Sequence, residues 1–178
     1  MYVGGIDIRK NVVALIDTFY TLKADFPDLR LLNVGKEFGL DNLLGDQGWH
    51  KAISSKPEYA KDILTPGFIS DADLAWLYSK AMAFVFPSRY EGFGLPVLEA
   101  MQAGCPVVAY DNSSIPEVAG DAALLVPDGQ TMVPAIKKVL QDEELRQALI
   151  KKGKHRAAQF TWEKTAKETL AVLEEVVG

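Results

Sequence analysis

The chain has 178 residues, of which 48% are hydrophobic and 24% are charged, the usual balance of a globular protein. This length fits one domain, or one domain with an appendage, and it buries enough surface to need no metal or disulfide for its core. The net charge of −5 disfavours a nucleic-acid partner, because such a partner requires a basic face. We find neither a signal-peptide pattern nor an apolar stretch that could cross a bilayer, and we expect a cytoplasmic protein.

Short apolar runs alternate with longer segments of helical period along the chain. The runs predict β-strands at 1–4, 29–34, 63–64, 83–86, 107–109 and 123–126. The longer segments predict helices at 11–24, 71–81, 95–103, 130–141, 143–159 and 162–176. Glycines and a proline interrupt the pattern between residues 41 and 61, where only one short helix is expected. The fold class is therefore α/β, a Rossmann-like, doubly wound and mostly parallel six-stranded sheet flanked by helices.

Three loops should meet at one edge of this sheet. Crossovers between parallel strands are almost always right-handed, and the ligand crevice lies at the carboxyl ends of the strands. The loops that leave the first, fourth and fifth strands at that edge are 4–11, 87–95 and 111–117. The motifs with functional content fall mainly in or beside these loops.

The segment 87–101 carries the strongest functional pattern. Gly92 and Gly94 let the backbone approach a ligand closely, and the helix that follows offers unpaired N–H groups to an anion. Two carboxylates, Glu91 and Glu99, flank this point, although a site for phosphate alone has no use for them. Either glutamate alone is readily explained as a surface charge or a helix-dipole partner. Together they suggest a nucleotide sugar, whose diphosphate would take the amides while its sugar and ribose hydroxyls take the carboxylates.

The opening loop brings positive charge to the start of a helix. Arg9 and Lys10 lie there, and either can neutralise a diphosphate leaving group, although each alone is simply explained as a solvated charge. Two glycines follow the strand, but the G-x-G-x-x-G fingerprint is absent. An NAD-dependent oxidoreductase is disfavoured for that reason, and because Asp25 and Asp28 precede the second strand instead of ending it.

Other polar motifs favour structural interpretations. Asp71-Ala-Asp73 has the spacing of a divalent-metal motif, but it opens a helix, where acidic residues are expected for capping. The tripeptide 112–114 fits an N-glycosylation site, yet a turn is favoured, and the loop 113–117 is equally well explained as a turn or as a ligand contact. The single cysteine, Cys105, lies in an apolar run that predicts a buried thiol, and neither histidine has metal-ligand neighbours.

Several segments resemble the carboxyl-terminal domain of the retaining family 4 glycosyltransferases, which have the two-domain GT-B fold. They are 2–11, 67–74, 88–101, 104–108 and 116–120, so the resemblance covers most of the chain. In that family the residue matching Glu91 contacts the donor sugar, and the residue matching Glu99 contacts the ribose. Amides matching 93–95 and the base matching Lys10 serve the diphosphate. Many members carry an arginine where this chain has Gly5, which leaves the phosphate site one charge short.

The resemblance therefore implies a set of site residues. The catalytic pair would be Glu91 and Lys10. The residues implied in donor binding are Gly5, Arg9, Lys10, Glu91, Gly92, Phe93, Gly94, Leu95 and Glu99. No metal site and no cofactor are expected, because the NDP-sugar is a substrate and the helix end together with Lys10 would carry the leaving-group charge.

The implied function is binding of an NDP-sugar, GDP- or UDP-linked, for retaining transfer to a sugar or lipid-linked acceptor. The enzyme would be a hexosyltransferase for mannose or glucose, and the alternative is a stand-alone nucleotide-binding module without turnover. Residues 1–160 would form the nucleotide-sugar domain, and a helix in 161–178 would pack toward an amino-terminal acceptor domain missing from this sequence. We expect this chain alone to bind nucleotide without transferring sugar, and its last helix to fray or pair with a second copy. Peripheral association of the full enzyme with the inner face of the membrane also agrees with the resemblance.

Overall fold

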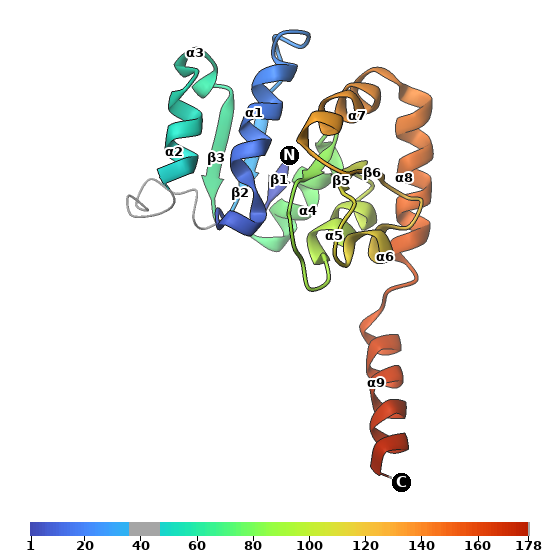
Figure 1. The fold of residues 1–178 in the computed structure, drawn as a ribbon. Helices are drawn as coiled ribbons and strands as arrows, with labels where there is room; N and C mark the ends of the chain where they lie inside the picture. Colours follow the sequence, from blue (N-terminus) through green and yellow to red (C-terminus); the bar gives the residue numbers. More distant parts are fainter. Residues whose placement is uncertain (36–46, 178) are drawn as a thin grey trace.

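The computed structural model describes residues 1–35 and 47–177, and Figure 1 shows their arrangement. The part of the poorly patterned 41–61 segment that precedes residue 47 lies outside the described residues. The rest of that segment forms two helices, α2 (Gln47–Ser54) and the single-turn α3 (Pro57–Ala60), one more than expected. Pro57 stands in the first turn of α3, where its missing N–H costs no helical hydrogen bond.

Six described strands pair in parallel in two groups of three. The first group has the order β1 (Tyr2–Val3), β2 (Leu31–Val34), β3 (Ile63–Gly67), and the second has β4 (Phe84–Phe86), β5 (Val107–Tyr110), β6 (Leu124–Val126). Two hydrogen bonds join the groups, from the Met1 amino group to the Ala83 carbonyl and from the Val85 amide to the Met1 carbonyl, each 2.9 Å long. In a parallel sheet one residue forms hydrogen bonds with the two residues that flank its partner on the next strand. Met1 does so with Ala83 and Val85, the two neighbours of Phe84, so the two groups form one continuous parallel sheet. The combined order β3-β2-β1-β4-β5-β6 confirms the predicted doubly wound fold.

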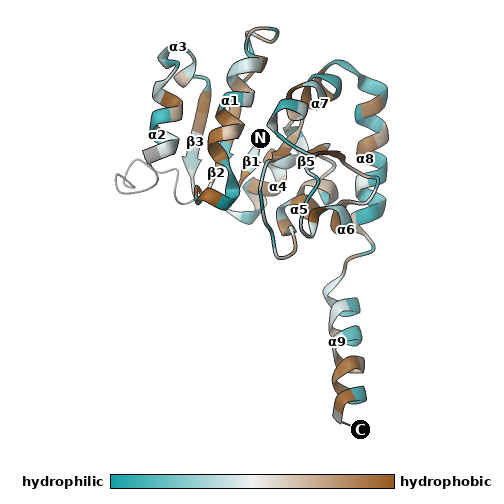
Figure 2. Cartoon of the chain, in the orientation of Figure 1, coloured by the Kyte–Doolittle hydropathy of each residue, from teal (hydrophilic) through white to brown (hydrophobic). Residues whose placement is uncertain are grey.

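Helices cover both faces of the sheet. On one side α1 (Val12–Leu22) contacts α2 and α7 (Gly129–Gln141). A second group of helices is centred on α5 (Leu95–Gln102), which contacts α4 (Asp71–Lys80), α6 (Ile115–Ala119) and α8 (Glu143–Ala157). Because both faces are covered, every residue of β4 and β5 is buried, as expected for strands of a parallel sheet. Figure 2 shows the hydrophobic residues along these inner elements.

Helix α4 turns one apolar face toward the core. Among the apolar residues at helical spacing in and just after it, Tyr78 is buried, and Leu74, Leu77 and Ala81 are half-buried. Tyr78 packs edge-on against the ring of Phe84, with 5.4 Å between ring centroids. Leu74 and Ala81 also pack against the core from the partly buried edge of this face.

A buried lysine ties the end of α1 to the start of β3. The ammonium of Lys23 lies 2.8 Å from Oδ2 of Asp62 and donates hydrogen bonds to the carbonyls of Pro27 and Leu29. Its side chain is only 4% exposed, so the charge needs these partners to offset the loss of water. The contact holds the turn after α1 against the amino end of the sheet.

The last helix, α9 (Trp162–Val177), extends away from the rest of the molecule (Figure 1). Its apolar side chains face solvent, and Trp162 and Val176 are each 79% exposed. Leu170 and Leu173 are also more than half exposed. None of the helices in residues 1–35 and 47–177 combines the length and apolarity needed to span a bilayer.

Candidate functional site

The carboxyl ends of β1, β4 and β5 bring together the three loops that the sequence placed there. The amide of Arg89 donates a 2.7 Å hydrogen bond to the carbonyl of Arg9, which joins the loops after β4 and β1. The side-chain amide of Asn112, after β5, donates to the carbonyl of Ser88 at 3.1 Å. The 112–114 tripeptide is therefore part of a turn whose asparagine amide is already occupied, as the turn interpretation predicted.

A close ion pair lies where the first two loops meet. The ammonium of Lys10 is 2.7 Å from Oε1 of Glu91, although 81 positions separate them in the chain. The two side chains are only 21% and 12% exposed, so the pair is largely shielded from water. A 3₁₀ turn, η1 (Ile8–Lys10), carries the lysine, and the left-handed residue Asn11 (φ 55°) ends that turn and begins α1. The structure thus brings together the two residues predicted to be catalytic.

Directly after Glu91, the backbone of residues 92–95 presents a row of unpaired amides. No described residue accepts a hydrogen bond from these four N–H groups, and the N-cap of α5 makes no side-chain capping bond. The cap residue, Gly94, has a φ of 104°, and a Cβ there would lie 2.7 Å from Cδ1 of Ile115. Free amides at a helix N-terminus attract anions through their own dipoles and that of the helix. This end of α5 is therefore suited to a phosphate group.

Two serines hold this amide row in place. The hydroxyl of Ser113 accepts a 3.1 Å hydrogen bond from the amide of Glu91. The hydroxyl of Ser114 donates to the carbonyls of Glu91 and Phe93, at 3.1 and 2.8 Å. The sequence prediction left the loop 113–117 open between turn and ligand contact, and it missed the short helix α6 that begins at residue 115. Two consecutive serines shortly after a central strand are the sequence feature from which this supporting role could have been predicted.

Arg9 and Gly5 lie in the opening loop but away from the ion pair. The guanidinium of Arg9 pairs with Asp7 at 3.1 Å, and its side chain is 65% exposed. Its backbone carbonyl, by contrast, receives the hydrogen bond that joins the loops. The carbonyl of Gly5 accepts a 2.8 Å hydrogen bond from the hydroxyl of Tyr2, a fully buried ring of the core. Of the two predicted bases, Lys10 therefore lies inside the site and Arg9 at its rim.

Glu99 lies one turn further along α5, on the side that faces α4. Its Oε2 accepts a 3.4 Å hydrogen bond from the hydroxyl of Tyr78, and it makes no described contact with Lys10 or Glu91. Burial, reinforced by the neighbouring carboxylate, raises the pKa of Tyr78, so its hydroxyl keeps its proton and remains a donor. A cavity of about 410 Å³ adjoins Glu99 between the two helices. The two glutamates thus lie in separate surroundings on either side of the amide row.

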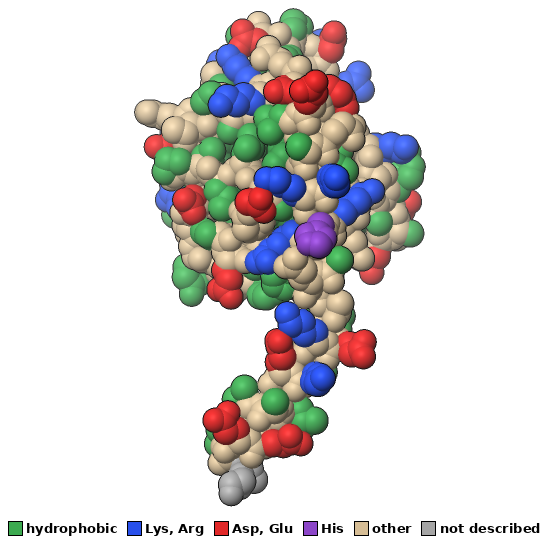
Figure 3. All heavy atoms as spheres, turned by 90° about the vertical axis from the view of Figure 1, so that its right-hand side faces the viewer, with side chains coloured by type: hydrophobic (Ala, Val, Ile, Leu, Met, Phe, Trp, Pro, Cys, Tyr) green, Lys and Arg blue, Asp and Glu red, His purple; other side chains and the backbone are tan. Residues whose placement is uncertain are grey.

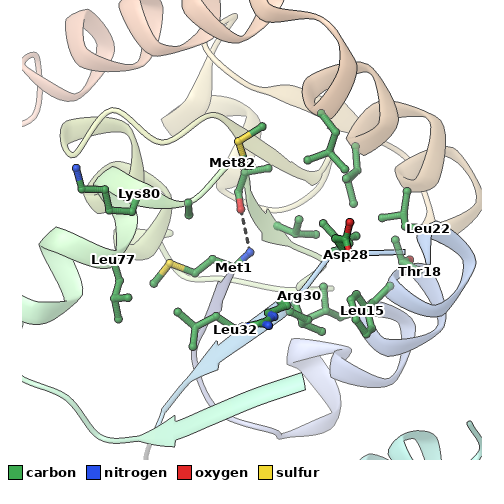
Figure 4. Close-up of a pocket in the computed structure, with 18 residues that line it drawn as sticks. Met1, Leu15, Thr18, Leu22, Asp28, Arg30, Leu32, Leu77, Lys80 and Met82 are labelled. Carbon is green, nitrogen blue, oxygen red and sulfur yellow. Dashed lines mark hydrogen bonds between the residues drawn. The ribbon is translucent and has the colours of Figure 1, made fainter. Parts of the chain in front are cut away.

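Two further hollows differ in character. A wide depression of about 970 Å³ with a mixed polar and apolar lining lies beside the site between α1 and α7, and its lining includes Arg89, Tyr110 and Asp128. A second cavity of about 370 Å³ lies at the opposite, amino edge of the sheet, lined mainly by apolar residues such as Leu15 and Met82 (Figure 4). Its apolar lining and its distance from the three loops make it unsuitable for a phosphate ligand.

The acidic motif 71–73 caps a helix, as predicted. The hydroxyl of Ser70, the N-cap of α4, accepts a hydrogen bond from the amide of Asp73 and donates a 2.6 Å bond to its carboxylate. Within the described ranges, no three His, Cys, Asp or Glu side chains are grouped so that they could hold a metal ion. Cys105 is buried and free, in agreement with the sequence.

Comparison with known proteins identifies relatives. Residues 1–156 match the family described as "Glycosyl transferases group 1". The chain is 34% identical over 183 residues to the O-antigen chain mannosyltransferase B of Escherichia coli, covering 96% of this chain and 44% of that protein. It is 30% identical over 177 residues to the phosphatidyl-myo-inositol mannosyltransferase of Mycolicibacterium smegmatis, covering 96% and 43%. A solved structure of sucrose-phosphate synthase from Thermosynechococcus elongatus superposes with a TM-score of 0.81 at 30% identity, covering 99% and 44%. The chain thus spans less than half the length of these proteins.

Proposed function

We propose that this chain, which belongs to the group 1 glycosyl transferases, is the donor-binding part of a retaining hexosyltransferase. It would bind an NDP-sugar, GDP- or UDP-linked, for transfer to a sugar or lipid-linked acceptor. The observation that carries this proposal is the row of unpaired amides at 92–95 directly beside the Lys10–Glu91 pair. Two relatives are named mannosyltransferases, which makes a mannosyl donor the first to test.

In this proposal the diphosphate binds at the N-terminus of α5. During transfer the bond between the anomeric carbon and the diphosphate oxygen breaks, so that negative charge develops on that oxygen. A bond forms from an acceptor hydroxyl oxygen to the same carbon, and the hydroxyl proton goes to the departing diphosphate. The amides of 92–95 and the Lys10 ammonium would stabilise this charge, an effect that is large in a site shielded from water. No metal or organic cofactor is required for this step. Glu91, already fixed beside Lys10, would accept hydrogen bonds from the sugar hydroxyls and orient the reacting carbon.

Glu99 would hold the ribose on the other side of the amide row. The Tyr78 hydroxyl contacts one of its carboxylate oxygens, which leaves acceptor capacity for two vicinal hydroxyls. The cavity between α4 and α5 borders this carboxylate and offers space nearby. The nucleotide would therefore lie across the start of α5, with its sugar toward Glu91 and its ribose toward Glu99.

The acceptor would be bound by a second, amino-terminal domain of a longer enzyme. This chain covers 44% of the Escherichia coli relative, so that protein has room for another domain of similar size. The exposed apolar side chains of α9 suit packing against such a domain. The chain alone would then bind nucleotide without transferring sugar, in the cytoplasm or at the inner face of the membrane. Transfer by the purified chain above a no-enzyme control would contradict this.

Calorimetry with GDP, UDP, ADP and NAD tests the binding site. Glu99→Ala should weaken nucleoside diphosphate binding about ten- to a hundredfold, because a charge-assisted hydrogen bond contributes about 1.5–3 kcal/mol. Lys10→Ala should also weaken it, since the ammonium faces the diphosphate. Glu91→Gln should leave it nearly unchanged, and in a two-domain enzyme should lower turnover instead.

The matched control is Glu117→Gln, which removes an exposed carboxylate of α6 outside the amide row. It should bind nucleoside diphosphate like the wild type. Absence of GDP and UDP binding by the wild type would overturn the proposed function. Identical behaviour of Glu91→Gln and Glu99→Ala would overturn the division of roles, because it would make both carboxylates ordinary surface charges.

A further inference from the structure

Residues at and just after the carboxyl end of α8 contact α6 and the amide row of the candidate site. Figure 3 views the molecule from this side and shows Lys and Arg side chains gathered on the body above α9. The sequence of α8 ends in the basic run Lys151, Lys152, Lys154, His155, Arg156, of which the first four are exposed. Arg156 is less exposed than these four, and its guanidinium is bonded to backbone carbonyls of α6.

Arg156 holds the short helix α6. Its Nε donates a 3.0 Å hydrogen bond to the carbonyl of Val118, and Nη2 donates to the carbonyl of Glu117. Its third group, Nη1, donates to the side chain of Gln159 at 2.7 Å. Three charge-assisted bonds from one guanidinium fix its plane. Helix α6 follows directly after the serines whose hydroxyls bond to the backbone of the amide row. By holding α6, Arg156 therefore also supports the position of these serines.

The fixed guanidinium also places an aromatic ring against the amide row. Its central carbon lies 4.9 Å from the centre of the Phe160 ring. Phe160 in turn meets Phe93 edge to face, with 6.0 Å between ring centroids and an interplanar angle of 80°. This is the favoured geometry for two aromatic rings. Phe93 belongs to the amide row and is 45% exposed, and Phe160 is the one aromatic ring paired with it among the described residues.

We propose that Phe160 is a positioning residue for the donor site, with Arg156 setting its orientation. By holding the Phe93 side chain, it restricts the backbone of 92–95 to the conformation in which the four amides have no protein acceptor and are left for a ligand. The hydrogen bonds with Ser113 and Ser114 hold the backbone of the same segment at Glu91 and Phe93. This inference rests on the proposed function, because it assumes that the amide row binds the diphosphate.

The test compares Phe160→Ala with Phe160→Tyr and with Trp162→Ala. The tyrosine keeps the ring and should behave like the wild type. Trp162→Ala removes a larger ring two residues away, which is 79% exposed and touches no other ring in the described part of the chain. Calorimetry should show GDP or UDP binding weakened about two- to tenfold by Phe160→Ala alone, the range set by one aromatic pair. Hydrogen exchange should accelerate at the amides of Glu91 and Val97, which are hydrogen-bonded to the Ser113 hydroxyl and the Gly94 carbonyl on either end of the amide row, and remain unchanged in β4 and β5.

A double-mutant cycle with Phe93→Ala separates positioning from general loss of stability. If the two rings act through their contact, the double variant should bind no more weakly than the weaker single variant. Additive losses, or equal affinity of wild type and Phe160→Ala, would overturn the proposal. If the wild type binds neither nucleotide, the proposed function fails, while the exchange rates of the hydrogen-bonded Glu91 and Val97 amides still decide whether Phe160 orders that segment. Faster exchange throughout the protein in Phe160→Ala but not in Phe160→Tyr would also count against a local role.

Discussion

Replacing Gly94 by alanine should destabilise the protein and displace the amide row. Left-handed backbone of this kind costs a residue with a Cβ about 1–3 kcal/mol. The new Cβ would also lie 2.7 Å from Cδ1 of Ile115, a side chain that is only 1% exposed and has little room to move. Overpacking of a core adds about 1–3 kcal/mol. The two contributions together predict a loss of about 2–6 kcal/mol in the free energy of unfolding.

Gly92→Ala is the matched control in the same loop. A Cβ at Gly92 meets nothing within 4 Å, and its φ is not left-handed, so stability should hardly change. Ile115→Val removes the clashing methyl and costs about 0.5–1.5 kcal/mol by itself, but in the Gly94→Ala background it should recover part of the loss. Urea denaturation measures each value. Equal stability of the two alanine variants, or no relief from Ile115→Val, would refute the reasoning.

Three further predictions follow from burial and charge. Burial raises the pKa of the Cys105 thiol to about 11, so at pH 8 the native protein should be alkylated far more slowly than the unfolded chain, and rapid labelling of folded protein would contradict this. The hydrogen bond from Lys23 lowers the pKa of Asp62, so its contribution to stability is present above the unfolded pKa of about 3.9 and disappears as the pH falls through the lower, folded value. The unfolding free energy of Asp62→Asn should therefore depend less on pH in acid, and parallel wild-type and variant curves would argue against the pair. The amides of α9 should exchange rapidly in a monomeric sample, and slow exchange without self-association would be inconsistent with its exposed apolar face.

Local pattern predicted most of the architecture. The central strands β4 and β5 were recognisable as short apolar runs, because a strand buried on both faces has no polar alternation. Only the first two residues of β3 were predicted, since the strand continues through Thr65, Pro66 and Gly67, of which the first two are exposed. The acidic residues of the 71–73 motif predicted the start of α4, since helix capping depends on contacts within the first turn. The additional short helices α3 and α6 were missed, because four or five residues are too few to show a helical period.

The sequence by itself also determined which residue types lie at the carboxyl edge of the sheet. Once β1, β4 and β5 are parallel neighbours, the loops that carry Lys10 and Glu91 must emerge on the same side. Their roles toward a donor remain predictions. The positive φ of Gly94 agrees with a glycine at that position, since other residues adopt it only at a cost.

Tertiary structure alone decided how these groups are paired. Lys10 and Arg9 are adjacent in the sequence, yet the first faces Glu91 across 81 positions and the second faces Asp7 near the surface. Phe160 reaches Phe93 from the end of α8, across 67 positions, and no local pattern marks that contact. Periodicity and capping depend on neighbours within a few residues, whereas such pairings depend on strand register and on the packing of helices that meet only when the chain is folded.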